Sequence, residues 1–214
     1  MKIERFVSNG PTKKVFFYLL AAFLGGCIPV MSLHSLYTKE NVVFEKKLLG
    51  TWEDPNKTMW QFSDANKPEK AYNLTFTDNE GKKGLFVAHL VKLKDKLFLD
   101  VYPVPWEQQD PNKIEWVYNT LFLVPAHTFI KINSIEPQLK MQVTDDEKMR
   151  EFLKADPNAV KHTLLEDKPV LTASTKELQT FVLKYADDVR VFPGEIVLLQ
   201  RKAKVSTISK AVKP

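Results

Sequence analysis

The chain has 214 residues, with 31 Lys and Arg against 26 Asp and Glu. Five of these charges lie in the first 26 residues, so residues 27–214 carry a net formal charge of only +2. This balance excludes the strongly basic surface that nucleic-acid binding requires, and the single cysteine excludes an internal disulfide. A length of this order is typical of one domain with a real core.

The first residues have the layout of a secretory signal. Basic residues are followed by an uncharged apolar run of ten residues, Val15 to Leu24. This run is too short to span a bilayer, which takes about 20 helical residues. A signal cut by the ordinary peptidase would favour an A-x-A-like site, but here Gly25, Gly26 and Cys27 follow the apolar run.

This Leu-Gly-Gly-Cys sequence resembles the lipobox of bacterial lipoproteins. The resemblance implies that residues 1–26 are a signal peptide cleaved between Gly26 and Cys27. It also implies that Cys27 carries acyl chains that hold the protein on a membrane of the cell envelope. Ile28 follows where some bacteria use Asp for inner-membrane retention, which favours the outer membrane, facing the periplasm. A plain signal peptide followed by a free cysteine is the alternative.

Composition divides the remainder into three parts. Residues 27–46 mix polar and apolar side chains without a sustained period, and we expect a tether that packs partly on the domain. Residues 47–202 are expected to form a single β-rich domain. Residues 203–214 are polar and basic, and we expect a disordered tail.

Alternation of apolar and polar side chains predicts the first strands. Tyr72, Leu74 and Phe76 alternate with three polar residues, which is the period of a half-buried strand. Turn residues separate the apolar runs, and connections this short leave no room for crossover helices. We therefore expect an antiparallel meander with strands at 57–64, 70–78, 84–93 and 97–102.

A long connection and a second group of strands follow. Residues 103–125 contain four prolines and several aromatic residues. We expect a long loop there, and loops of this length often carry function. Further strands are expected at 126–135 and 138–143, with a closing strand at 194–202.

The apolar period changes to that of a helix after residue 143. Thr144 with Glu147, and Ser174 with Glu177, fit the capping box that satisfies free amides at a helix start. Apolar side chains at helical spacing follow each pair. The sequence thus predicts two short amphipathic helices near the C-terminal end, with the strand-like segment 161–172 between them.

Gly50-Thr51-Trp52 forms a Gly-x-Trp motif at the start of the domain. The motif resembles the opening motif of lipocalins and other calycins, in which the Trp closes the barrel floor and a cation of the last strand lies over it. The resemblance implies that Trp52 and Arg201 are such a barrel-closing pair. It also implies a mainly β fold whose meander closes into a calycin-like barrel. A generic antiparallel sheet, or a strongly curved one, with helices packed on one side is the alternative.

Support for catalysis is weak. The four histidines lack metal-ligand spacing, and the sequence contains neither G-x-S-x-G nor a glycine-rich phosphate loop. His89 and His127 lie in strand-like runs and would converge if those strands paired, so a metal-dependent or acid–base site there is the enzymatic alternative. Core or edge histidines are the other interpretation. We expect no enzyme activity, no metal and no cofactor.

Aromatic residues are the better indication of function. Trp60, Phe62, Phe86 and Phe98 are the predicted lining of an apolar site if the barrel is open. If the barrel is filled, the same side chains are core. The sequence thus predicts a membrane-anchored envelope lipoprotein that binds a hydrophobic small molecule or lipid without catalysis. The alternative is a structural or assembly lipoprotein that docks onto an envelope protein through the 103–125 loop.

Overall fold

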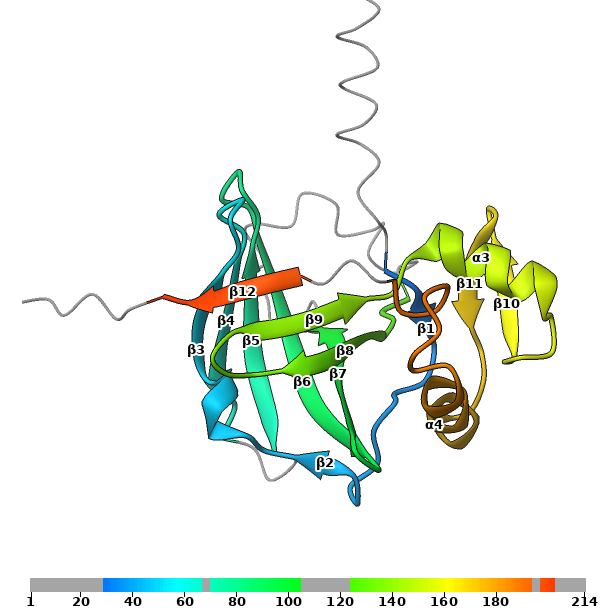
Figure 1. Cartoon of the computed structure of the whole chain (residues 1–214), viewed down its shortest axis with the longest axis horizontal. Helices are drawn as coiled ribbons and strands as arrows, with labels where there is room; N and C mark the ends of the chain where they lie inside the picture. Colours follow the sequence, from blue (N-terminus) through cyan, green and yellow to red (C-terminus); the bar gives the residue numbers. More distant parts are fainter. Residues whose placement is uncertain (1–28, 67–69, 105–123, 194–196, 203–214) are drawn as a thin grey trace, which may run out of the picture.

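The structure is a computed structural model that describes residues 29–66, 70–104, 124–193 and 197–202. The predicted signal peptide with Cys27, most of the predicted loop at 103–125, and the tail at 203–214 lie outside these residues. The described part is mainly β, with a large barrel beside a layer that holds two helices and a small sheet (Figure 1).

Eight antiparallel strands close into the barrel. Each strand from β3 to β9 pairs with the next, and β12 pairs with both β9 and β3, which closes the ring. The strands are β3 (Gly50–Glu53), β4 (Met59–Asp64), β5 (Ala71–Thr77), β6 (Lys83–Leu93), β7 (Lys96–Pro103), β8 (Thr128–Ser134), β9 (Leu139–Val143) and β12 (Val197–Arg201). The predicted antiparallel meander that closes into a barrel is confirmed.

The two ends of the barrel differ. We call the end where β3 begins and β12 ends the floor, and the opposite end, where the β3–β4 and β5–β6 turns lie, the mouth (Figure 1). A 3₁₀ helix, η1 (Lys46–Leu48), precedes β3 at the floor. Alternation along β5 places Tyr72 and Leu74 inside, both buried, while Asn73 between them is exposed.

A second layer covers one side of the barrel. It contains α3 (Asp146–Ala155), α4 (Thr175–Lys184) and a three-stranded sheet of β1 (Met31–Ser32), β11 (Lys168–Leu171) and β10 (His162–Leu165). The two short helices precede the closing strand, as predicted. The strand-like segment between them forms the β10–β11 hairpin.

Helix capping follows the prediction at one helix only. Ser174 and Glu177 form the predicted capping box of α4. At α3 the prediction was wrong, because Asp145 rather than Thr144 is the N-cap. The hydroxyl of Thr144 instead accepts a buried hydrogen bond of 3.0 Å from the amide of Val30. The Thr144 hydroxyl, which the local pattern assigned to the helix start, thus binds Val30, a residue far away in the sequence.

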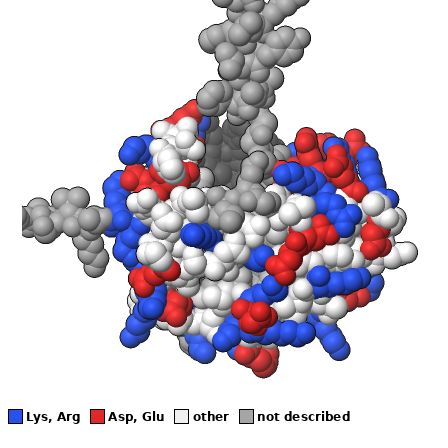
Figure 2. Space-filling model, viewed as in Figure 1, with Lys and Arg blue, Asp and Glu red and all other residues white. Residues whose placement is uncertain are grey.

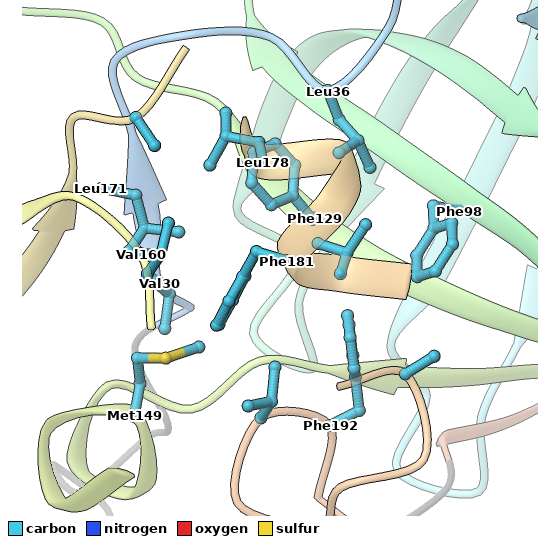
Figure 3. Packing of buried hydrophobic residues seen from close by; sticks show 14 of the residues in the cluster. Val30, Leu36, Phe98, Phe129, Met149, Val160, Leu171, Leu178, Phe181 and Phe192 are labelled. Atoms are coloured by element: carbon cyan, nitrogen blue, oxygen red, sulfur yellow. The ribbon is translucent and has the colours of Figure 1, made fainter. Parts of the chain in front are cut away.

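The described residues form two hydrophobic cores that share a wall. The inner core fills the barrel, and the outer core lies between the outer face of β6, β7 and β8 and the helices (Figure 3). Phe98 of β7 and Phe129 of β8 point outward into this second core, where the Phe98 and Phe192 ring centroids are 5.8 Å apart. Strand β7 is therefore buried on both faces.

Residues 29–45, which we call the strap, are part of the domain. The strap begins beside the mouth, forms β1, and continues to β2 (Val42–Val43), which pairs with β6. In Figure 1 it runs down the side of the barrel to reach η1. Val30, Leu36 and Val42 are buried. Through these side chains the described part of the predicted tether packs on the domain.

Candidate functional site

The floor of the barrel is built on Trp52 and Arg201. The two residues are paired across β3 and β12, and the Arg201 guanidinium carbon lies 4.2 Å from the centre of the Trp52 ring. Trp52 is fully buried, and its indole Nε1 donates a 2.9 Å hydrogen bond to the carbonyl of Leu48. The structure thus brings together the two residues that the sequence predicted as a barrel-closing pair.

The guanidinium of Arg201 also fixes the chain that enters β3. Its Nη1 donates to the carbonyl of Leu49 at 2.7 Å, and its Nη2 donates to the carbonyl of Lys47. The backbone favours glycine at position 50, because its φ of +123° is rarely adopted by other residues. A Cβ at this position would also lie 2.8 Å from Nη1 of Arg201, so the guanidinium would have to shift. The Gly-x-Trp spacing therefore has a physical basis.

Tyr72 completes the floor. Its hydroxyl accepts a hydrogen bond from the amide of Glu45 at 2.6 Å and lies 3.2 Å from the carbonyl of the same residue. Its ring stacks on Phe44 with centroids 4.7 Å apart. Burial raises the pKa of Tyr72 to about 12. Phe62 packs edge-on against Tyr72 and is only 2% exposed, so this predicted lining residue belongs to the packed floor.

The mouth is lined by side chains that are only partly buried. On seven strands the inward side chain nearest the mouth is half-buried, whereas the next inward side chain on each of these strands, towards the floor, is buried. On β6 this first side chain is Phe86, because the inward position before it is Gly84. We call these seven residues the mouth ring; they are Trp60, Phe76, Phe86, Pro103, Thr128, Val143 and Val197. Two of the four predicted lining residues, Trp60 and Phe86, belong to the ring.

The mouth ring is apolar except for Thr128. Its Oγ1 is buried and has no hydrogen-bond partner among the described residues. An unsatisfied buried hydroxyl costs about 1–3 kcal/mol, so a ligand with a polar group at this position would gain by binding it. Sequence reasoning missed Thr128, because nothing in the local pattern marks a threonine at a strand start as inward-facing.

Phe98, the remaining predicted lining residue, does not face the barrel interior. Its side chain is fully buried in the outer core, beneath the helices (Figure 3). The prediction was wrong because both faces of β7 are covered by apolar groups. Phe98, Leu99 and Val101 are all buried, so apolar character does not distinguish inside from outside on this strand.

His89 and His127 lie on the outer face of the barrel, on either side of Asp100. Nδ1 of His127 is 2.7 Å from Oδ1 of Asp100, whose carboxylate is fully buried. His89 is directly opposite Asp100 across β6 and β7 and stacks on Tyr37 of the strap at 3.9 Å. The amide of Leu36 donates to Oδ2 of Asp100 at 2.6 Å. This cluster attaches the strap to the barrel.

The cluster has no metal-binding geometry. Among the residues that the structure describes, no group of three or more His, Cys, Asp or Glu side chains could hold a metal ion. Asp100 was not among the candidate residues, although an acidic residue within the apolar run Leu97 to Tyr102 is a sequence signal for a buried charge that needs partners.

Within the described ranges, none of the helices has the length and apolar character needed to cross a bilayer. No protein-family model, no curated protein and no solved structure matches the chain.

Proposed function

We propose that this chain is an envelope lipoprotein, anchored to the membrane by acyl chains on Cys27, whose calycin-like barrel binds a hydrophobic small molecule or lipid at its mouth without catalysing a reaction. The mouth ring is the observation that carries the proposal. Half-buried apolar side chains converge there from strands all around the barrel, above an interior that is otherwise packed.

The composition of the mouth supports an apolar ligand. Small-molecule sites are concave and mostly apolar, with a few polar groups that fix orientation. Trp60 contacts Phe76 edge-on with centroids 5.3 Å apart, and Phe86 lies on the neighbouring strand. Thr128 supplies an unsatisfied hydroxyl in the same ring. This combination suits a ligand with a long apolar part and a small polar group.

The floor supports the calycin-like assignment. Gly50, Trp52 and Arg201 make a contact like that implied by the resemblance, with the guanidinium over the indole ring. In that family the Trp closes the barrel floor, and the packed floor of this barrel, with its half-buried mouth at the opposite end, fits the same arrangement.

The anchor is supported by the leader sequence. A basic segment, a ten-residue apolar run and Gly25-Gly26-Cys27 fit lipid attachment, and two or more acyl chains give stable membrane association where one does not. Ile28 favours the outer membrane, on its periplasmic side. We expect Cys27→Ser to abolish acylation, detectable as the loss of the acyl mass and of membrane retention. Unchanged acylation of this variant would contradict the proposal.

Docking onto an envelope protein is the second candidate. The predicted docking loop at 103–125 lies mostly outside the described residues, so Trp106 and Trp116 are not placed. Val124, at the end of that segment, is 75% exposed, although a single exposed apolar side chain is ordinary on a protein surface and only a larger patch marks a contact site. This single side chain is weaker support than the mouth ring.

Native mass spectrometry of the full acylated chain, purified from membranes, tests the binding proposal. We expect a lipid-sized species that is lost on denaturation and is identified after organic extraction. Val197→Trp should block the mouth and reduce the bound species. Leu198→Trp is the matched control, because this neighbouring side chain is 44% exposed and lies on the outer face of β12.

Two results would contradict the binding proposal. One is a wild-type protein that carries no bound species. The other is a folded Val197→Trp variant, verified by circular dichroism, that retains as much ligand as Leu198→Trp does. In either case the docking function becomes the better explanation, and crosslinking in intact cells would then be the way to find the partner.

A further inference from the structure

The described chain begins beside the mouth of the barrel. Val30 is 2% exposed, and its amide donates to Thr144, the residue that follows the mouth-ring member Val143. Ser32 is then bridged to His127, just before the start of β8 at the same end. The attachment point of the strap is therefore fixed at the mouth, and the strap leads away from it towards the floor (Figure 1).

Only a very short segment separates this point from the proposed anchor. Cys27 precedes Val30 by three residues, which span at most about 11 Å when fully extended. Strand β6, with 11 residues, is about 33 Å long, and because barrel strands are tilted by about 35–45° it covers about 25 Å of the height between the two ends of the barrel. A segment of three residues is therefore too short to let the floor approach a bilayer that holds acyl chains on Cys27.

Exposed apolar side chains gather on the same side. Leu164 and Leu165 of β10 are 49% and 59% exposed. In the parallel β1–β11 ladder Met31 pairs with Val170. Lys168, two residues before Val170 on β11, pairs with Leu165 at the end of β10. The tip of the β10–β11 hairpin thus extends from Met31 in the direction of Cys27.

Two other exposed apolar residues lie at the mouth itself. Leu85 is 47% exposed near the start of β6, and Val124 is 75% exposed shortly before β8. Together with Leu164 and Leu165 they are four of the seven large apolar side chains that are exposed among the described residues.

Charge does not favour contact between this surface and an anionic membrane. The hairpin tip carries Glu166 and Asp167 next to Lys168, and the face shown in Figure 2 has basic and acidic side chains interspersed. An acidic tip is not attracted to anionic lipids. Contact with a membrane would therefore depend on the acyl anchor and on apolar side chains.

From these observations we infer that the mouth of the barrel faces the bilayer that holds Cys27, and that the ligand is the acyl chain of a lipid taken from that bilayer. The inference rests on the proposed function, because it requires both the anchor and the binding mouth. It adds the orientation of the domain, a membrane-contact surface that includes Leu85 and Leu165, and the chemical class and source of the ligand.

Site-specific fluorophores test the orientation in the acylated full chain. Acylation consumes the only native thiol, so a cysteine introduced at one position can be labelled uniquely. Leu165→Cys labels the mouth side, and Asp95→Cys, in the exposed β6–β7 turn at the floor, is the control. The labelled proteins are reconstituted in phosphatidylcholine vesicles that contain a spin-labelled phosphatidylcholine.

We expect several-fold stronger quenching at position 165 than at position 95. A Gly-Ser insertion of about 20 residues between Ile28 and Pro29, with a mean span of about 25 Å, should weaken the quenching at position 165. Equal quenching at both positions, or stronger quenching at position 95, would overturn the orientation.

The source of the ligand is tested on the same vesicles. The delipidated acylated protein is reconstituted with deuterated phosphatidylcholine and then examined by native mass spectrometry. Bound deuterated lipid in Leu198→Trp, and less in Val197→Trp, is the expected result. Absence of deuterated lipid from a protein that carries another species when purified from cells would overturn the inferred source and leave the binding proposal intact. Quenching at position 165 without any bound species from either preparation would contradict the binding proposal alone.

Discussion

Replacing Arg201 with alanine removes three contacts that close the floor of the barrel. The guanidinium donates to the carbonyls of Lys47 and Leu49 and covers the ring of Trp52. The Arg201 side chain is 38% exposed, so for each hydrogen bond we take about 1 kcal/mol, the central value for an ordinary hydrogen bond, in place of the larger value for a buried charged donor. The cation–π contact adds about 0.5–1 kcal/mol at an exposed site. The free energy of unfolding should therefore fall by about 2–3 kcal/mol.

Urea unfolding followed by far-ultraviolet circular dichroism measures this loss, which corresponds to a decrease of about 5–10 °C in Tm for a domain of this size. Lys202→Ala is the matched control. The side chain of this neighbouring cation forms an exposed 3.1 Å ion pair with Glu53 and a weak 3.7 Å contact with the sulfur of Met59, and its removal should cost less than about 1 kcal/mol. Arg201→Lys keeps the charge but loses the fork of two donors, so it should lie between the two. A loss below about 0.5 kcal/mol for Arg201→Ala would refute the account of the floor.

Three further changes probe the two cores. Phe98→Ala removes a fully buried ring and should lower the free energy of unfolding in urea by about 3–5 kcal/mol. Because the ring lies outside the barrel, the bound ligand should not change, and loss of ligand from the folded variant would contradict the placement of Phe98. Asp100→Ala leaves His127 and the amide of Leu36 without their acceptor. The free energy of unfolding should fall by about 2–4 kcal/mol, and hydrogen exchange at the Leu36 amide should become faster. Unchanged exchange would contradict the role of Asp100 in holding the strap. Folding raises the pKa of Tyr72 from 10 to about 12, because the neutral hydroxyl is favoured in the buried site. The contribution of Tyr72 to the free energy of unfolding is therefore fully present below pH 10 and is lost as the pH rises towards 12. The loss, on the order of 2 kcal/mol, should be absent in Tyr72→Phe, and equal pH profiles of the two proteins would refute it.

The sequence was informative where one face of a strand is exposed. Along β5, Tyr72 and Leu74 are buried and Asn73 is exposed, so simple alternation gave both the strand and its inward face. On β7 the same reasoning fails. Phe98, Leu99, Asp100 and Val101 are all buried there, because helices cover the outer face as completely as the barrel covers the inner one. Two-sided burial removes the period that identifies the interior.

Contacts between distant segments were the other limit. Strands β1 and β2 have two residues each, too few for a period, and they form only because β11 and β6 offer free edges. Likewise, the Thr144 hydroxyl does not cap the helix because it accepts a hydrogen bond from Val30, which is 114 residues away in the sequence. Such partners depend on topology, and topology is not contained in a local pattern.

The shared wall limits how the barrel can open. The helices have ten residues each, which is too short for stability in isolation, so they depend on the outer core. Moving them away would expose Phe98 and Phe129, at a cost of about 1.5–3 kcal/mol for each ring, and would also break the ion pairs of Lys96 and Lys131 with Asp187. The strap is held to the same wall through Asp100. The helical layer is thus a fixed support of the barrel, and under the proposed function a ligand would enter through the mouth ring.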